Sequence, residues 1–297
     1  LKVTDEDGNT VDEWVSKEEA HIIKGLIVGK KYKMTETKPA DGYVTAESIE
    51  FTVENTKEVQ KHQMLDDVTK VEISKKDITD SSEVPGAKLI ILDKDGKKVE
   101  SWTSTDKPHM VEKLPVGEYT LREEQAPDGY LIAEDVKFTV KDTGKVQKVK
   151  MKDAHPYGKL VIKKTDSTSK AALSGAEFEL REKESGKVVE KLVTDKTGTA
   201  TSGKIPIATY KNGKVEKTVE YILVETKAPN GYELSSKKEE IRFEYKDGKT
   251  KVIEIVKEIK NTKSPSGSTP TGNSPKTGDS TNIWLPILLA VLSACGI

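Results

Sequence analysis

The chain has 297 residues, with 49 Lys or Arg against 50 Asp or Glu, so its formal net charge is only −1. This balance leaves no basic field, and we expect no nucleic-acid partner. One cysteine, Cys295, excludes an internal disulfide and a cysteine-ligated metal site, and the four histidines are scattered singly. We therefore expect no metal site, and the low aromatic content favours about two or three small domains over one large core.

Short segments of alternating apolar and polar residues, bounded by turn signals, predict an all-β chain over residues 1–262. The first segment, "LKVTDEDGNTVDEW" (1–14), has a counterpart, "LIILDKDGKKVESW", at 89–102. Both contain an acidic tetrapeptide, but neither has the glutamate that a calcium loop carries at its twelfth position, so we expect β-turns there. Nothing has a sustained helical period, which makes tandem β-sandwiches the predicted class.

A motif that starts with glutamate and ends with tyrosine occurs three times along the chain. Its copies are "ETKPADGY" (36–43), "EEQAPDGY" (123–130) and "ETKAPNGY" (225–232). The leading glutamates are 87 and 102 residues apart, which suits tandem domains better than a solenoid, whose repeats are shorter. We place three domains at residues 1–66, 67–155 and 156–262, and their short linkers favour a rod-like array.

The second and third domains begin with similar predicted strands, "KVEISKKD" (70–77) and "GKLVIKKTD" (158–166). The first domain contains no counterpart of these strands. We therefore expect it to be truncated at its N-terminus and the chain to be a fragment. Later in the second domain, "VKFTVKDTGKVQKVKMKD" (136–153) predicts two strands joined as a hairpin by "KDTG".

The three repeated glutamates continue an alternation of apolar residues, so each faces the core side of its strand. They are Glu36, Glu123 and Glu225. The same alternation turns a first-strand lysine inward in the two complete domains, and an Asp or Asn of the last strand in all three. These residues are Lys75, Lys164, Asp66, Asp153 and Asn261. Because an unpartnered charge is costly in a core, we expect a buried triad in each complete domain.

Such a triad could form a covalent bond. A buried lysine tends to lose its proton and a buried carboxyl tends to keep one. The neutral amine is a nucleophile, the protonated carboxyl or the Asn amide is an acyl acceptor, and the glutamate can shuttle protons. The product is an amide, formed with loss of water or ammonia and without a cofactor. The alternative is a buried ion network that stays non-covalent.

The pattern "VxIxKxD … PGA … ExxAPDGY … last-strand Asp/Asn" resembles the Cna B-type domains, also called SpaA-like or prealbumin-like domains, of Gram-positive adhesins and pilins. The resemblance covers residues 1–262. It implies immunoglobulin-like β-sandwiches, each with an intramolecular Lys–Asp or Lys–Asn isopeptide bond that the glutamate promotes. On this basis Lys75 pairs with Asp153, with Glu123 as the promoting residue.

In the third domain the resemblance pairs Lys164 with Asn261 and gives Glu225 the promoting role. Glu225 and Asn261 are 36 residues apart, against 30 in the second domain, and we expect the extra residues in "ELSSKKEE" and the final hairpin. The first domain keeps Glu36 and its acceptor Asp66, with Asp67 as the alternative, but no partner lysine.

The C-terminal part has a different composition. Residues 263–273 are rich in Ser, Thr, Pro and Gly and predict a disordered linker, and "IWLPILLAVLSACGI" (283–297) predicts the start of a truncated transmembrane segment. Between them lies "SPKTG", which resembles a sortase sorting signal within residues 274–297. Its residues are Ser274, Pro275, Lys276, Thr277 and Gly278. The resemblance implies cleavage after Thr277 and attachment of Thr277 to peptidoglycan, although Ser274 replaces the commoner leucine.

These features together predict an extracellular, cell-wall-anchored stalk that displays an adhesive region. Its expected partners are a sortase, peptidoglycan and, before sorting, the membrane. The alternative is a binding module or minor pilin subunit whose domains themselves bind a host or matrix protein. We do not expect an enzyme acting on outside substrates, because the reactive residues are buried and react once.

Overall fold

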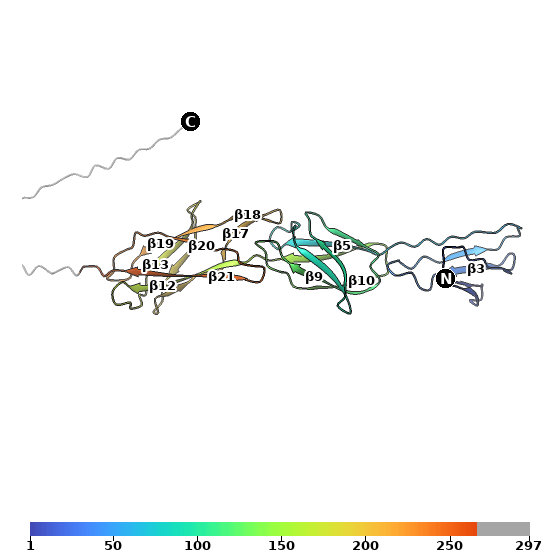
Figure 1. Ribbon diagram of the computed structural model, residues 1–297, viewed down its shortest axis with the longest axis horizontal. Coiled ribbons are helices and arrows are strands. Elements are labelled where there is room, and N and C mark those ends of the chain that lie inside the picture. The colour runs from blue at the N-terminus through green and yellow to red at the C-terminus, as the bar shows by residue number, and fades with distance from the viewer. Residues whose placement is uncertain (266–297) are drawn as a thin grey trace, which may run out of the picture. The chain divides into compact units, whose positions relative to one another are not determined.

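The computed structural model describes residues 1–265, where every regular element is a β-strand (Figure 1). The strands fall into three successive groups along the chain, so the predicted all-β fold of tandem sandwich domains is confirmed. No helix in this range is long and apolar enough to cross a bilayer. The predicted sorting and apolar segments, and nearly all of the predicted linker, lie outside the described residues.

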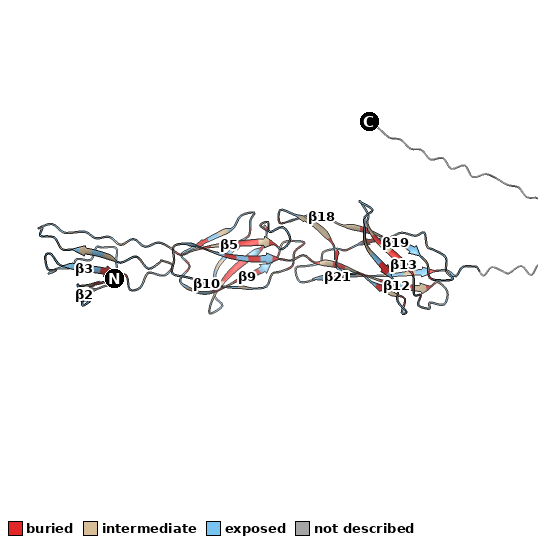
Figure 2. Ribbon diagram, turned by 180° about the vertical axis from the view of Figure 1, so that it is seen from behind, coloured by how far each residue is buried: buried red, intermediate tan, exposed pale blue. Residues whose placement is uncertain are grey.

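The second domain consists of two sheets that enclose an apolar core. The first sheet contains, in order, β10 (Val136–Val140), β9 (Gly117–Gln125), β6 (Lys88–Asp93) and β7 (Lys98–Thr103). The second sheet contains β11 (Val146–Asp153), β5 (Lys70–Asp77) and β8 (His109–Glu112). Buried and less buried residues alternate along β9 and β11, and Figure 2 colours the buried residues red. The core therefore lies between β5 and β11 on one side and β6 and β9 on the other.

The first and last strands of this domain are parallel neighbours, with Asp153 of β11 opposite Asp77 of β5. By contrast, β10 pairs with β9 in the other sheet, so the predicted hairpin over residues 136–153 is wrong. The turn after β10 instead takes the chain from one sheet to the other. The local turn signal could not reveal this, because consecutive strands do not always pair.

The third domain repeats this plan. Its first sheet contains β14 (Val188–Val193), β13 (Glu177–Glu182), β19 (Glu220–Lys227) and β20 (Glu239–Arg242). Its second sheet contains β15 (Thr199–Thr201), β12 (Tyr157–Asp166) and β16 (Ile205–Pro206), with β21 (Val252–Asn261) parallel to β12. The first and last strands are again direct neighbours.

Two insertions lengthen the third domain. A hairpin of β17 (Ala208–Lys211) and β18 (Lys214–Thr218) precedes β19 and accounts for much of the longer interval before the third glutamate. The additional residues between Glu225 and Asn261 lie mostly in the connection from β20 to β21. They were expected partly in "ELSSKKEE", but that loop is nearly as long as its counterpart between β9 and β10.

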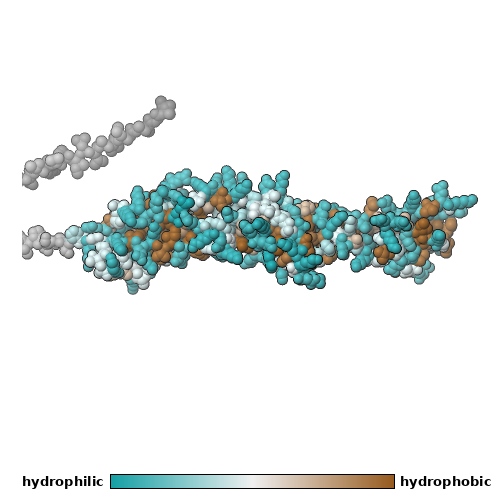
Figure 3. Space-filling view, viewed as in Figure 1, coloured by the Kyte–Doolittle hydropathy of each residue, from teal (hydrophilic) through white to brown (hydrophobic). Residues whose placement is uncertain are grey.

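The first domain forms one sheet only, with the order β2 (Thr10–Glu13), β1 (Lys2–Thr4), β3 (Lys31–Thr35) and β4 (Ile49–Thr52). This sheet corresponds to the sheet of β7, β6, β9 and β10 in the second domain. Apolar side chains remain on its surface, which Figure 3 shows as brown patches over this domain. Among them, Val15 is 83% exposed and Leu65 is 77% exposed.

Residues 53–67 contain no strand, although the sequence predicts the last strand of the first domain there. Asp66 is exposed, so the prediction that it faces the interior is wrong. A strand needs a neighbour for its backbone N–H and C=O groups, and the described part of the chain holds no counterpart of β5 beside this segment. Register along a strand therefore does not by itself bury a residue.

Candidate functional site

Three charged side chains meet inside the second domain, as the sequence predicts. Lys75 comes from β5, Glu123 from β9 and Asp153 from β11, and each side chain is at most 1% exposed. The Nζ of Lys75 donates a hydrogen bond to Asp153 Oδ1 and lies 3.0 Å from Glu123 Oε2. The backbone N–H of Ala133 donates to the same Glu123 oxygen over 2.6 Å. The glutamate is therefore held against both the amine and the loop that follows β9.

The surroundings of Asp153 favour its protonated form. Burial raises the pKa of Asp153 to about 7, and neighbouring Glu123 adds to the rise while Lys75 opposes it. Glu123 Oε1 and Asp153 Oδ2 are buried, and neither has a hydrogen-bond partner among the described residues. A proton on the carboxyl of Asp153 would supply the donor that both oxygens lack. This protonated carboxyl is also the form that an amine can attack.

The corresponding triad of the third domain consists of Lys164 from β12, Glu225 from β19 and Asn261 from β21. The Nζ of Lys164 donates to Asn261 Oδ1 and lies 2.9 Å from Glu225 Oε1. The Asn261 amide donates to Glu225 Oε1 over 3.0 Å and to the backbone carbonyl of Glu233 over 3.0 Å. Burial lowers the pKa of Lys164, with Glu225 opposing, and so increases the fraction of neutral amine.

Glu225 contacts both nitrogens that amide exchange would involve. Its Oε1 atom lies 2.9 Å from the Nζ of Lys164, which would attack, and 3.0 Å from the Nδ2 of Asn261, which would leave. One carboxylate can therefore accept a proton from the first nitrogen and return it to the second without solvent. Because the amine is held against the side-chain carbonyl, its effective concentration is high.

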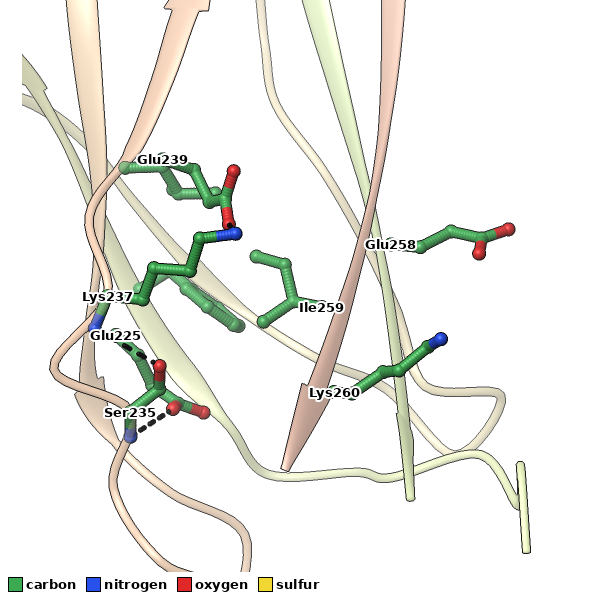
Figure 4. A pocket seen from close by; sticks show the side chains of 9 residues that line it. Glu225, Ser235, Lys237, Glu239, Glu258, Ile259 and Lys260 are labelled. Atoms are coloured by element: carbon green, nitrogen blue, oxygen red, sulfur yellow. Dashed lines mark hydrogen bonds and ion pairs between the residues drawn. The ribbon is translucent and has the colours of Figure 1, made fainter. Parts of the chain in front are cut away.

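A hollow of about 270 Å³ opens beside this triad, and Glu225 forms part of its lining. Figure 4 shows Glu225 receiving a hydrogen bond from the backbone of Ser235, which measures 2.9 Å, with Lys237 and Glu239 nearby. The glutamate side chain is only 1% exposed, so it closes the inner end of the hollow.

The first domain retains the glutamate environment without a triad. Glu36 is 9% exposed, and its Oε2 accepts a hydrogen bond of 2.7 Å from the backbone N–H of Ala46, as Glu123 does from Ala133. No lysine among the described residues accompanies it. The structure brings Glu36 together with the loop that contains Ala46. It leaves Asp66 exposed, because the segment of Asp66 has no neighbouring strand, among the described residues, of the kind that β5 provides for β11.

A backbone contact establishes which aspartate of the first domain is equivalent to the acceptors of the others. The residue after the tyrosine of each motif donates its N–H to the carbonyl of the residue after the acceptor position. These bonds are Val44 to Asp67 at 2.9 Å, Leu131 to Ala154 at 2.9 Å and Glu233 to Thr262 at 3.0 Å. The equivalent of Asp153 and Asn261 is therefore Asp66, and the alternative Asp67 instead pairs with Lys70.

Sequence reasoning missed a second pair of residues beside each triad. The tyrosine that ends the motif donates its hydroxyl to the aspartate two residues after the lysine. The bonds are Tyr130 to Asp77 at 2.8 Å and Tyr232 to Asp166 at 2.9 Å. The signal was present, since both first strands contain Lys-x-Asp and every motif ends in Gly-Tyr. Only the fold reveals that the two short patterns meet.

Comparison with known proteins identifies this domain type. A family model described as SpaA, a prealbumin-like fold domain, matches residues 1–67, 69–155 and 158–259. No curated protein matches the chain. The structure of the Bacillus anthracis TIE protein is 29% identical, with a TM-score of 0.51, and the match covers 78% of this chain but 42% of that one. The chain thus spans less than half of that protein.

Two pilins are also similar at lower levels. The Streptococcal ancillary pilin is 17% identical, with 80% of this chain and 76% of that chain covered and a TM-score of 0.30. The major pilin SpaD from Corynebacterium diphtheriae is 15% identical, with 66% and 98% covered and a TM-score of 0.30.

Proposed function

Because the chain belongs to the family of SpaA domains with a prealbumin-like fold, we propose that it is part of an extracellular stalk stiffened by isopeptide bonds of its own making. The observation that carries the proposal is the pair of buried triads, Lys–Glu–Asp and Lys–Glu–Asn, each in contact across three strands. A buried ion pair alone is weak support for stability, because desolvation offsets its attraction. Formation of a covalent bond would explain why these buried polar side chains are present despite the cost of removing them from water.

In the third domain, Glu225 takes a proton from the nitrogen of Lys164, and that nitrogen bonds to the Cγ of Asn261. The bond from Cγ to Nδ2 then breaks, and ammonia leaves with the proton that Glu225 returns. In the second domain, Lys75 attacks the protonated carboxyl of Asp153 in the same way, and water leaves. Each site reacts once, so the chain does not act as an enzyme on outside substrates.

The attachment of the stalk is part of the same proposal. A sortase would cut "SPKTG" between Thr277 and Gly278 and join Thr277 to peptidoglycan, after the apolar segment at 283–297 had held the chain at the membrane. The composition of this tail supports the proposal. The domains would then hold an adhesive region away from the wall. Incubation with a sortase and a glycine nucleophile should yield a product in which the Thr277 carbonyl is joined to the amine of that glycine, whereas Thr277→Ala should give none.

The bonds have a direct test in the intact mass of the chain. We expect residues 1–265 to weigh less than their sequence mass by one water and one ammonia. Lys75→Ala should restore the water alone, because Asp153 is the carboxyl acceptor of Lys75, whereas the acceptor of Lys164 is an amide. Lys152→Ala, an exposed lysine on β11, is the matched control and should change the mass only by the substitution. Recovery of the full sequence mass from the unmodified chain would exclude the covalent proposal.

A further inference from the structure

The Asp–Tyr hydrogen bond occupies the same place in both complete domains. Asp77 and Asp166 are the last residues of β5 and β12, two positions after the lysine of each triad. Both are buried, at 0% and 3% exposure. Each uses one carboxylate oxygen for the tyrosine hydroxyl and the other for donors in the turn that follows its strand, such as the backbone N–H of Thr79 and Thr168.

The tyrosine lies in the loop that completes the site. In the third domain, three consecutive contacts of this loop reach three different strands or their ends. Tyr232 bonds to Asp166, the carbonyl of Glu233 accepts from Asn261 Nδ2, and the N–H of Ser235 donates to Glu225. The loop therefore touches the end of the nucleophile strand, the acceptor and the proton shuttle within four residues.

The first domain separates these contacts. Its loop still donates from Ala46 to Glu36, and from Val44 to the carbonyl of Asp67. Its tyrosine, Tyr43, has no first-strand aspartate among the described residues, and its hydroxyl instead accepts a hydrogen bond of 2.9 Å from Lys113. The loop thus contacts the glutamate and the segment that carries the acceptor without help from the tyrosine. What the tyrosine adds in the complete domains is a connection to the strand that carries the lysine.

We propose that Asp166 with Tyr232, and Asp77 with Tyr130, are positioning pairs that set the lysine strand in register with the glutamate and the acceptor for bond formation. The proposal rests on the isopeptide reaction proposed above. A lysine side chain has many rotamers, so the position of its strand end determines how often the amine meets the acceptor carbonyl. Small displacements of reacting groups cost large factors in rate.

The third domain provides the cleaner test, because in the second domain His155 also contacts Asp77, at 2.8 Å. The full chain is synthesised in a cell-free reaction and sampled over time. After proteolysis, mass spectrometry quantifies the cross-linked peptides of β12 with β21 and of β5 with β11. Tyr232→Phe should slow the first bond about tenfold, as expected for the loss of one hydrogen bond to a charged group, while the second bond in the same molecules keeps its rate.

Two sets of variants separate positioning from general stability. Tyr43→Phe changes the equivalent tyrosine in the first domain, for which residues 1–265 hold no lysine strand, and neither bond should slow. Asp166→Asn keeps an oxygen that can accept from Tyr232, so its bond should form faster than that of Asp166→Ala. This ranking also keeps the proposal testable if Tyr232→Phe fails to fold. A further control uses Lys164→Ala, which cannot form the bond of the third domain. Adding Tyr232→Phe to this variant should leave the hydrogen-exchange protection of β13 and β19 at the level of Lys164→Ala alone.

The outcomes distinguish this inference from the function on which it rests. If the unmodified chain forms neither bond, both fail. If it forms both bonds and Tyr232→Phe forms them at the unmodified rates, or slows the two equally, the positioning role alone is overturned. A large loss of protection in the unbonded background, with an unchanged rate of bonding in folded molecules, would likewise assign Tyr232 a purely structural role.

Discussion

The acceptor is the residue that differs between the two triads, and its chemistry sets what each site needs. Asn261 carries a leaving nitrogen that Glu225 already contacts, whereas Asp153 must hold a proton before an amine can attack it. Burial raises the pKa of Asp153 to about 7, so this proton is present below that pH and is lost above it. Two sites with the same geometry should therefore respond differently to pH.

We expect bond formation in the second domain to slow, relative to the third, as the pH rises through about 7. The lowered pKa of Lys164 acts in the other direction in the third domain, because a higher pH increases its neutral fraction. The measurement is the amount of the β5–β11 cross-linked peptide divided by the amount of the β12–β21 cross-linked peptide. It is made on chain newly synthesised below and above that pH, and we expect this ratio to fall. Asp153→Asn should remove the difference between the domains. A ratio that stays constant or rises with pH would contradict the assignment of Asp153 as the protonated acceptor.

At the scale of strands, the parallel pairing of first and last strands would make a single bond of the proposed kind effective. Lys164 and Asn261 are 97 positions apart in the sequence but lie on neighbouring strands, β12 and β21. A bond between them would close nearly the whole third domain into one loop. Cross-links that close long loops restrict the unfolded chain most, in the entropic account of their effect.

Lys164→Ala should lower the free energy of unfolding of the third domain by about 4 kcal/mol or more, because it removes this closure and leaves the buried Glu225 without the Lys164 nitrogen as a hydrogen-bond donor. Lys163→Ala is the matched control, since its side chain is exposed on the same strand, and should cost less than about 0.5 kcal/mol. Hydrogen exchange in β13 and β19 reports on this domain separately from the others. Equal stability of the two variants would show that no bond closes the loop.

The strands differ in how far the sequence could predict them. Alternation in β5, β9 and β11 predicts which side Lys75, Glu123 and Asp153 face, and the structure places all three together. The pairing of β11 with β5 was not predictable from the turn before it, because pairing depends on contacts distant in sequence. The same limit explains Asp66: the strand and the burial predicted for it both require a neighbouring strand, and the described residues hold none beside it.

At the scale of the whole molecule, the domains meet through specific contacts as well as short linkers. Tyr210 of the β17–β18 hairpin donates its hydroxyl to the carbonyl of Gly129 over 2.8 Å, and its ring stacks on His155. Between the first two domains, Thr45 donates its backbone N–H and its hydroxyl to Asp142. Such contacts limit the freedom that linker length alone would allow.

Stretching the chain from its two ends should lengthen its domains unequally. With both bonds formed, the residues between Lys164 and Asn261 cannot be pulled out, whereas the first domain, with no lysine for Glu36 among the described residues, should unfold and extend. Lys164→Ala should release 97 residues, or roughly 330 Å of additional length. Single-molecule force spectroscopy measures this step directly. An unmodified chain that already shows the step would argue against closure of the third domain.

The parallel register of β5 and β11 also determines which atoms would carry tension across the second domain. Tension entering at Lys70 would follow β5 only as far as Lys75, cross the new amide to Asp153 and leave the domain there. Strands β6 to β10, with most of the apolar core, would form a side branch that bears no load. Their sequences would then be free to vary under the demands of folding alone, while mechanical strength would depend on a short stretch of one strand.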